Sequence, residues 1–204
     1  AYPSDLCDAD DLAERGYADG VPMGSTLGAQ QGVGGPTFVV SAKQDPERTP
    51  LQRIQIVKGW LDGDDYEVTV YDVDGDPDNG ASVDLDTCEP QGQGFADLCT
   101  VWQDPDFDPG QRAYYYARVI QNPTCRWTTH QCVEASYDCE DPTREIDLDC
   151  CDPATGLNVD WCEAIDCSDP GSLPPADARC CVPTVEPVIQ ERAWGSPIWY
   201  QPPN

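Results

Sequence analysis

The sequence is poor in lysine and histidine, and it lacks any long apolar run. Lys43 and Lys58 are the only lysines, and 28 Asp and 10 Glu against 11 Lys and Arg give a formal net charge of −27. Such a surface repels nucleic acid and anionic lipid, whose binding depends on basic side chains at the phosphates. No apolar stretch approaches the roughly 18 residues of a membrane-spanning helix. We therefore expect neither nucleic-acid binding nor a membrane span. The negative charge is compatible with binding of divalent cations, with a high-salt environment or with cationic partners, and also with an acidic surface that is simply solvated.

Motifs of the common catalytic classes are also missing. The chain contains no GxSxG motif, no P-loop and no GxGxxG followed by a helix. Its one histidine, His130, lies in "CRWTTHQC" between two expected half-cystines, where a surface histidine is the simpler interpretation than a nucleophile's base. Paired carboxylates for glycoside hydrolysis are compatible with the composition, but acids are so abundant that no pair stands out. We predict that the chain is not an enzyme.

Cysteine, by contrast, is abundant. Twelve cysteines, an even number, are typical of disulfides formed in an oxidising compartment. Zinc binding is the alternative, but C-x₂-C knuckles are absent and histidine is scarce. The chain begins "AYPSDLC" without methionine, as a mature exported protein does after signal-peptide removal. The sequence thus predicts an extracellular or periplasmic protein.

The cysteines are unevenly spaced along the chain. Three are scattered and nine crowd into residues 125–181, so that pairing cannot be deduced from order alone. We expect Cys88 to pair with Cys99 across a local loop, and Cys7 to pair at the edge of the cluster with Cys125. All twelve are predicted half-cystines: Cys7, Cys88, Cys99, Cys125, Cys132, Cys139, Cys150, Cys151, Cys162, Cys167, Cys180 and Cys181.

Most of the remaining chain has the pattern of β-strands. Runs rich in β-branched and aromatic residues are separated by Pro, Gly and Asp turns, and only "DADDLAERGYADG" is helical in character. The spacing predicts a mainly β protein, an antiparallel sandwich of the immunoglobulin or fibronectin type. "YYYARV" would lie in the penultimate strand, and "AWGSPIWY" in a last strand paired with it. The expected strands cover residues 36–43, 51–61, 65–73, 98–103, 112–120 and 190–200.

The cysteine cluster is expected to interrupt this sandwich. Residues 125–183 lack sustained periodicity and are rich in Asp, Pro and Gly, so disulfides rather than a core must hold them. We therefore predict a disulfide-rich irregular insertion between the last two strands. The predicted organisation is an N-terminal arm with a short helix (1–35), a sandwich (36–124 with 184–204) and the insertion (125–183).

Two acidic turns are candidate calcium sites, since calcium takes six to eight oxygens from flexible loops. "YDVDGDPDNGASVDLD" begins like an EF-hand loop but departs from it at its glycine, at Pro77 and at the missing final glutamate. The alternative is an acidic hairpin turn with "DNG" at its tip. "DPDFDPG" is the second turn. The candidate ligands are Asp72, Asp74, Asp76, Asp78 and Asp84 in the first, and Asp104, Asp106 and Asp108 in the second.

Several longer stretches carry a family resemblance. "GYADGVPMG", "PLQRIQIVKGWLDG", "VWQDPDFDPGQRAYYYARVIQNPTCRW" and "IQERAWGSPIWY" resemble the C-terminal part of the secreted domain-of-unknown-function family 3604. The resemblance implies a β-sandwich tail. Members carry an upstream region like a PHP-type metallohydrolase, whose metal ligands are largely histidines. This sequence shows no such region and has one histidine, so the resemblance carries over no catalytic residue.

Three functions follow as hypotheses. The first is a non-catalytic extracellular structural subunit that assembles, into a filament for example, with itself or with other exported proteins. The second is an accessory module of a PHP-like metal-dependent hydrolase. The third is a module that binds calcium or, through exposed aromatics, carbohydrate; its candidate aromatics are Trp60, Trp102, Trp127 and Trp161.

We favour assembly, because disulfide-dense, lysine-poor domains suit long-lived extracellular structures. The N-terminal arm "AYPSDLC" and the tail "IWYQPPN" are expected to add to the sheet edges of a neighbour. Removal of residues 1–6 or 198–204 is then predicted to abolish association while leaving the monomer folded.

Overall fold

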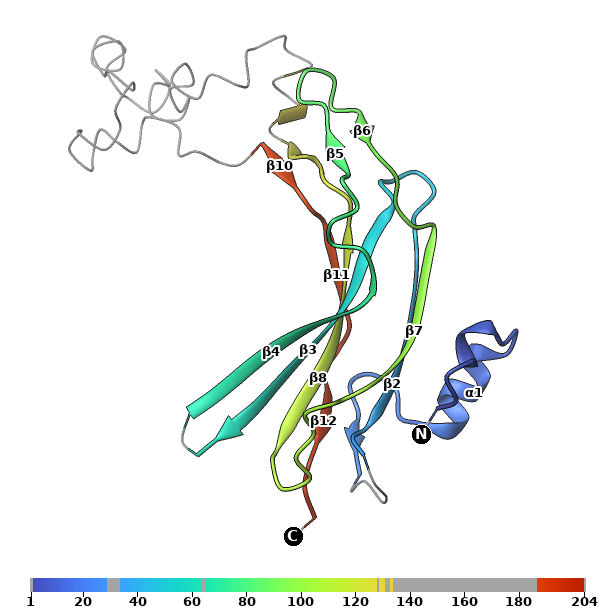
Figure 1. The fold of residues 1–204 in the computed structure, drawn as a ribbon, viewed down its shortest axis with the longest axis vertical. Coiled ribbons are helices and arrows are strands. Elements are labelled where there is room, and N and C mark those ends of the chain that lie inside the picture. The colour runs from blue at the N-terminus through green and yellow to red at the C-terminus, as the bar shows by residue number, and fades with distance from the viewer. Residues whose placement is uncertain are drawn as a thin grey trace, which may run out of the picture. The chain divides into compact units, whose positions relative to one another are not determined.

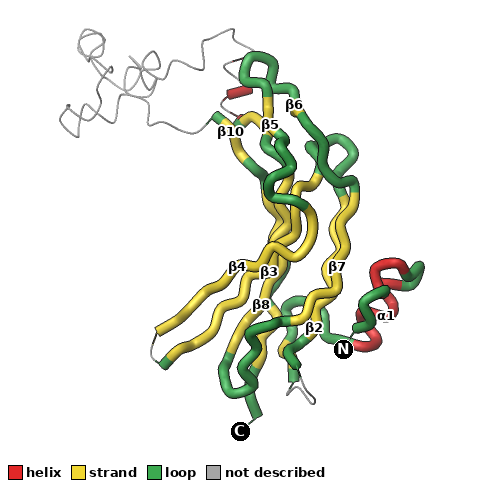
Figure 2. Tube along the Cα trace, in the orientation of Figure 1, coloured by secondary structure: helices red, strands yellow, loops and turns green. Residues whose placement is uncertain are grey.

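The computed structural model describes residues 2–28, 34–63, 65–127, 129–130, 133 and 187–203. It is mainly β, as predicted, and strands dominate the trace in Figure 2. The predicted N-terminal helix is confirmed within residues 8–20. The elements in chain order are η1 (Leu6–Asp8), α1 (Leu12–Asp19), β1 (Thr26–Leu27), β2 (Thr37–Lys43), β3 (Leu51–Asp62), β4 (Asp65–Gly75), β5 (Ser82–Val83), β6 (Pro90–Gln91), β7 (Asp97–Gln103), β8 (Ala113–Gln121), β9 (Thr124–Cys125), β10 (Val188–Ile189), β11 (Arg192–Trp194) and β12 (Ile198–Tyr200).

The chain divides into two compact units. The first comprises Ala1–Ser82, Pro90–Thr124 and Gln190–Asn204, and the second comprises Val83–Glu89 and Cys125–Ile189. The boundaries expected from the sequence stay predictions, and most of the expected insertion lies outside the described residues.

Two sheets form the first unit (Figure 1). The larger has the strand order β1-β12-β8-β3-β4, with β11 also paired to β8, and the smaller is the β2–β7 pair. The last strands pair antiparallel with β8, as predicted, although the 190–200 segment is split into β11 and β12. The sheets are antiparallel except for one parallel pair, β1 with β12. The immunoglobulin or fibronectin topology itself stays a prediction.

Strands β3 and β4 form a long hairpin. Asp62 pairs with Asp65, and Gly63 at the turn has φ 64°, a left-handed conformation that tight hairpin turns require. β3 contains Ile, Val and Trp residues, and β4 contains Val, Tyr and Thr residues, all of which suit a pleated surface. Figure 1 shows the hairpin extending away from the β2–β7 pair.

The core lies between the two sheets. Side chains alternate along β3, so that Ile54 and Ile56 point inward and are almost fully buried. They meet Phe38 of β2 and Leu98 of β7, which shows that the two sheets face one another. The main cluster is formed by Phe38, Ile56, Ala113, Tyr115 and Tyr200.

Both disulfide pairings expected from the sequence are wrong. Cys7 pairs with Cys99, and Cys88 pairs with Cys125. Cys99 lies on β7 opposite Ser41 of β2, and the η1 helix brings Cys7 to it from 92 residues away. Proximity in sequence suggested Cys88 with Cys99, but the β7 pairing places Cys99 elsewhere. The other eight cysteines lie outside the described residues.

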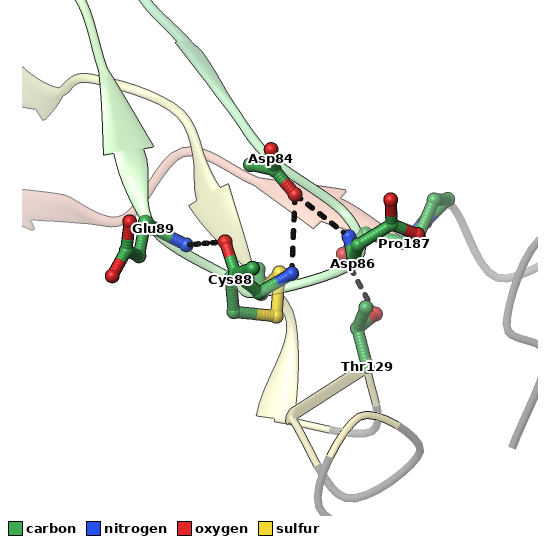
Figure 3. Close-up of a disulfide and its surroundings, with 8 residues drawn as sticks. Asp84, Asp86, Cys88, Glu89, Thr129 and Pro187 are labelled. Carbon is green, nitrogen blue, oxygen red and sulfur yellow. Dashed lines mark hydrogen bonds between the residues drawn. A yellow bond between two sulfur atoms is a disulfide. The ribbon is translucent and has the colours of Figure 1, made fainter. Parts of the chain in front are cut away.

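In the second unit, a disulfide joins Cys88, which lies in a tight turn of residues 84–88, to Cys125 (Figure 3). The Asp84 carboxylate accepts hydrogen bonds from the backbone N–H groups of Asp86 and Thr87, and the Asp84 carbonyl accepts one from Cys88 N–H. Cys88 has φ 58°, which is uncommon for a residue other than glycine. The local hydrogen bonds and the disulfide together hold this conformation. Among the described residues, no helix has the length and apolarity needed to cross a membrane.

Candidate functional site: the outer face of the larger sheet

The side of the larger sheet that faces away from β2 and β7 carries apolar residues from four strands. On β3 and β4, Leu61 pairs with Tyr66, and Gly59 and Val57 pair with Val68 and Val70. Paired residues project from the same face of a sheet, so these side chains form one surface. The same register continues into β8 and β12, where Tyr114 pairs with Gly59 and Trp199 pairs with Tyr114. We call this surface the outer face: Leu61, Tyr66, Val68, Val70, Tyr114, Tyr116 and Trp199.

Much of the outer face is accessible to solvent. Tyr66 is 78% exposed, Leu61 52%, Trp199 48%, Val68 46% and Val70 45%. Large apolar side chains exposed singly are normal, but a contiguous group of this kind marks an interaction surface.

Aromatic packing makes the middle of the outer face rigid. The Tyr114 ring lies where a Cβ at position 59 would be, so Gly59 is the residue that lets the ring lie flat on β3. Tyr114 stacks on Tyr116 with ring centroids 6.4 Å apart, and it contacts Trp199 at 5.6 Å. Because the rings hold one another, little side-chain entropy is lost when a partner covers them.

Charged side chains at one end of the outer face have side-chain partners, and Asp62 and Asp65 lie at the other end, at the hairpin turn. Arg53 forms an ion pair with Asp72 (Nε to Oδ1, 3.0 Å), and Arg118 Nε donates to Gln55 Oε1 at 2.7 Å. The seven residues of the outer face include no acid and no base. On a chain with a net charge of −27, this surface is unusual in lacking acidic side chains.

The opposite side of the same strands holds a buried ion pair. Lys58 Nζ lies 2.7 Å from Asp104 Oδ2, and the two side chains are 3% and 0% exposed. Tyr115 donates its hydroxyl to the same carboxylate oxygen at 2.7 Å, and Lys58 Nζ also donates to the Asp106 carbonyl at 2.7 Å. A buried charge of each sign is thus compensated by its partner and by hydrogen bonds. The network fixes residues 104–106 against β3 and β8.

Two tyrosines beside this network are held protonated. Burial, followed by the hydrogen bond to Asp104, raises the pKa of Tyr115 well above its ordinary value. Burial, followed by the hydrogen bond to Asp106, raises the pKa of Tyr71 to about 12. Both hydroxyls act as donors to carboxylates, since ionisation would place two negative charges together.

The structure places the first set of calcium candidates in separate roles. Asp72 accepts from Gln55 Nε2 at 2.7 Å in addition to its ion pair with Arg53. Asp74 accepts from the N–H of Gly75, and Asp76 accepts from the N–H of Asp78. Asp84 belongs to the turn in the second unit. The carboxylates of Asp74, Asp76 and Asp84 stabilise local backbone turns, whereas Asp72 contacts side chains of the neighbouring strand.

The second set is bound into the buried network and its turn. Asp104 pairs with Lys58, Asp106 accepts from the Tyr71 hydroxyl at 3.0 Å, and Asp108 accepts from the N–H of Gly110. Among the described residues, no group of three or more His, Cys, Asp or Glu side chains is arranged to hold a metal ion. Calcium binding stays a prediction, which thermal melting in calcium, with magnesium as control, would test.

The aromatics proposed for carbohydrate binding lie in different places. Trp60 and Trp102 pack against the core, and Trp127 in the second unit is 68% exposed. Trp161 lies outside the described residues. Among the exposed aromatics that the sequence did not single out, Tyr66 and Trp199 lie on the outer face.

Sequence reasoning missed both Lys58 and the outer face. The sequence contains a pattern that points to each of these two features. Lys58 is one of two lysines and stands in an apolar strand, which is typical of a buried, paired lysine. Val68 and Val70 alternate with Glu67 and Thr69, but which side of β4 would be covered depends on tertiary structure.

The features described so far define a class of protein: a mainly β module with two facing sheets, stabilised by disulfides. The family profile described as "Protein of unknown function (DUF3604)" matches residues 1–147. The chain belongs to this family, in agreement with the resemblance of its motifs. No curated protein and no solved structure matches the chain.

Proposed function

We propose that this chain is a non-catalytic, exported structural module that self-associates through the outer face. The observation that carries the proposal is the apolar surface of Leu61, Tyr66, Val68, Val70, Tyr114, Tyr116 and Trp199, of which five are 45% exposed or more. Exposed patches of this kind are covered by protein partners. The disulfides suit an oxidising extracellular setting.

The distribution of charge favours a second copy as the partner. Two copies that met through most other surfaces would bring acid against acid, because each carries 27 net negative charges. The seven residues of the outer face are uncharged; Arg53, Asp72 and Arg118 flank one end of the face, and Asp62 and Asp65 flank the other end at the hairpin turn. Two copies can therefore approach there without strong local repulsion. The aliphatic residues Leu61, Val68 and Val70 also favour a protein partner over a sugar, which stacks on aromatic rings.

The proposed interface differs from the terminal arms expected from the sequence. Residues 198–200 form β12 between β1 and β8, and Tyr200 is 1% exposed in the core. Leu6 is fully buried, and the next residue, Cys7, is disulfide-bonded. Removing either end would remove part of the fold, so we now expect both truncations to destabilise the monomer, in place of the folded monomers expected from the sequence.

Sedimentation velocity over a range of protein concentrations tests the proposal. We expect wild-type protein to associate reversibly, and association to strengthen as salt is raised, because salt screens the repulsion between acidic surfaces but not apolar contact. The variant Val68→Thr/Val70→Thr keeps β-branched side chains but makes the centre of the β4 contribution polar. It is expected to remain monomeric at concentrations where the wild type associates.

The matched control is Ala96→Thr, which adds a hydroxyl at an exposed position outside the outer face. It should associate like the wild type. If wild-type protein sediments as a monomer at every concentration and salt level, the self-association proposal fails. The module would then be better explained as the accessory part of a hydrolase.

A further inference from the structure

The sandwich is open along one side. Strand β2 pairs with β7, and no strand in the described part of the chain pairs with its other edge. The backbone N–H and C=O groups along that edge of residues 37–43 are available to a further strand. Free edges of this kind are templates for strand addition.

A groove of about 730 Å³ runs along this edge. Its floor is made by residues of the sandwich interior, among them Phe38 and Val40 from β2 and Tyr115 and Val119 from β8. Residues of α1 and of the segment that follows it form one wall. Two large exposed apolar side chains, Tyr17 and Met23, line the groove as well.

Ala193 shows that the interior is uncovered here. It pairs with Val119 of β8, whose side chain packs against the core cluster of Leu51, Ile54 and Leu98. Ala193 therefore projects from the inner side of the sheet, yet it is exposed. An inward-facing residue remains exposed only where no strand covers it.

The dimensions and the chemistry of the groove suit an extended peptide. Strand β2 has seven residues, which span about 23 Å at the usual rise. A peptide along it would form main-chain hydrogen bonds with β2 and direct alternate side chains onto Phe38 and Val40. Asp19 is the only charged residue among the described residues that line the groove.

The negative charge of the groove wall and of the chain determines which kind of peptide can bind in the groove. With Asp19 in the wall and a net charge of −27 on the chain, a strand with basic residues is attracted and an acidic strand is repelled. We infer that the groove accepts an extended strand from a different polypeptide, with alternating apolar residues and a net positive charge, as an added strand on β2. This inference rests on the open edge of β2 and not on self-association through the outer face, with which the groove shares one lining residue, Tyr116.

The inference that a peptide strand adds to β2 can be tested by hydrogen exchange. Exchange of the β2 amides is measured by NMR on the full chain, with and without synthetic peptides. The probe is the nonapeptide KVTVTVTVK, which alternates apolar residues between basic ends. Saturating peptide is expected to slow exchange of alternate β2 amides by about tenfold or more, as for newly formed ladder bonds. KVTVPVTVK, whose proline removes a central donor, and the acidic EVTVTVTVE are expected to bind at least about tenfold more weakly.

Variants identify the site. Ala193→Trp fills the groove from an exposed position and should abolish the peptide's effect on β2, whereas Ala96→Trp, exposed outside the groove, should not. Ser196→Trp is a second filling variant, should Ala193→Trp fail to fold.

Absence of peptide binding to wild-type protein would overturn the inference, as would binding without protection of β2 or equal binding of the acidic peptide. Protection of β2 that grows with protein concentration alone would assign the groove to a second copy and also overturn it. None of these outcomes depends on whether the outer face associates.

Discussion

The three consecutive tyrosines of β8, Tyr114 to Tyr116, show how the two faces of one sheet differ. Tyr115 points inward, is 1% exposed and donates its hydroxyl to Asp104. Tyr114 and Tyr116 point outward, stack on one another and are only partly covered. The inner face of the sheet satisfies its polar groups within the fold, and the outer face offers apolar area that the described chain leaves uncovered. The inner side therefore accounts for stability and the outer side for interaction.

The largest effect is expected on the inner face, from Lys58→Met. Removing the ammonium leaves Asp104 buried without its charged partner, which costs about 3–5 kcal/mol in the free energy of unfolding. Denaturant unfolding followed by fluorescence measures it. Lys43→Met is the matched control, because Lys43 is the other lysine and is exposed, so that its loss should change stability by less than about 0.5 kcal/mol. Equal effects of the two substitutions would show that the Lys58 ion pair does not stabilise the core.

A smaller effect is expected beneath the Tyr114 ring of the outer face, from Gly59→Ala. The added methyl group meets the Tyr114 ring, which must move off β3, and overpacking of this kind costs about 1–3 kcal/mol. In a Tyr114→Ala background the same substitution should cost much less, since the ring is gone. Equal costs in both backgrounds would contradict the packing of Tyr114 on Gly59.

High pH should weaken the inner face selectively. The pKa of Tyr71 is raised from 10.0 to about 12, so the folded state holds this proton more tightly than the unfolded state does. The associated stability is complete below pH 10 and is lost as the pH rises from 10 through 12. The free energy of unfolding should therefore fall over this window, and Tyr71→Phe should make the fall shallower. An unchanged slope in the variant would show that Tyr71 is not linked to folding.

The smallest effect on stability is expected on the outer face. Val68→Thr/Val70→Thr should change the free energy of unfolding of the monomer by only about 0.5 kcal/mol, because both side chains are 45% exposed or more. Thermal melting at a concentration too low for association measures it. A loss as large as that of Lys58→Met would mean that these valines serve the fold rather than a partner.

The sequence predicted the strands of the sandwich well and its long-range pairing poorly. The β-branched runs at 36–43, 51–61, 65–73, 98–103 and 112–120 correspond to β2, β3, β4, β7 and β8, because period and composition act locally. Both disulfide partners were assigned wrongly, since η1 reaches Cys99 through tertiary packing that no local pattern encodes. In the aspartate turns, the carboxylates of Asp76 and Asp108 accept hydrogen bonds from backbone N–H groups, and calcium binding stays a prediction.

The functional surfaces were the least predictable part. Alternation along β4 shows that two faces exist, but whether a second sheet covers one, both or neither depends on where the hairpin lies in the fold. The free edge of β2 follows likewise from strand order and from the absence of a further described strand beside it.

Hydroxyl-radical footprinting at low and high protein concentration tests the central claim most directly. Tyr66 and Trp199 lie on the outer face, whereas Tyr17 lies on α1 and is 70% exposed. Association through the outer face predicts that oxidation of Tyr66 and Trp199 falls as concentration rises, while oxidation of Tyr17 stays constant. Constant oxidation of Tyr66 and Trp199 in a sample that sediments as an oligomer would contradict the account, because the copies would then meet through another surface.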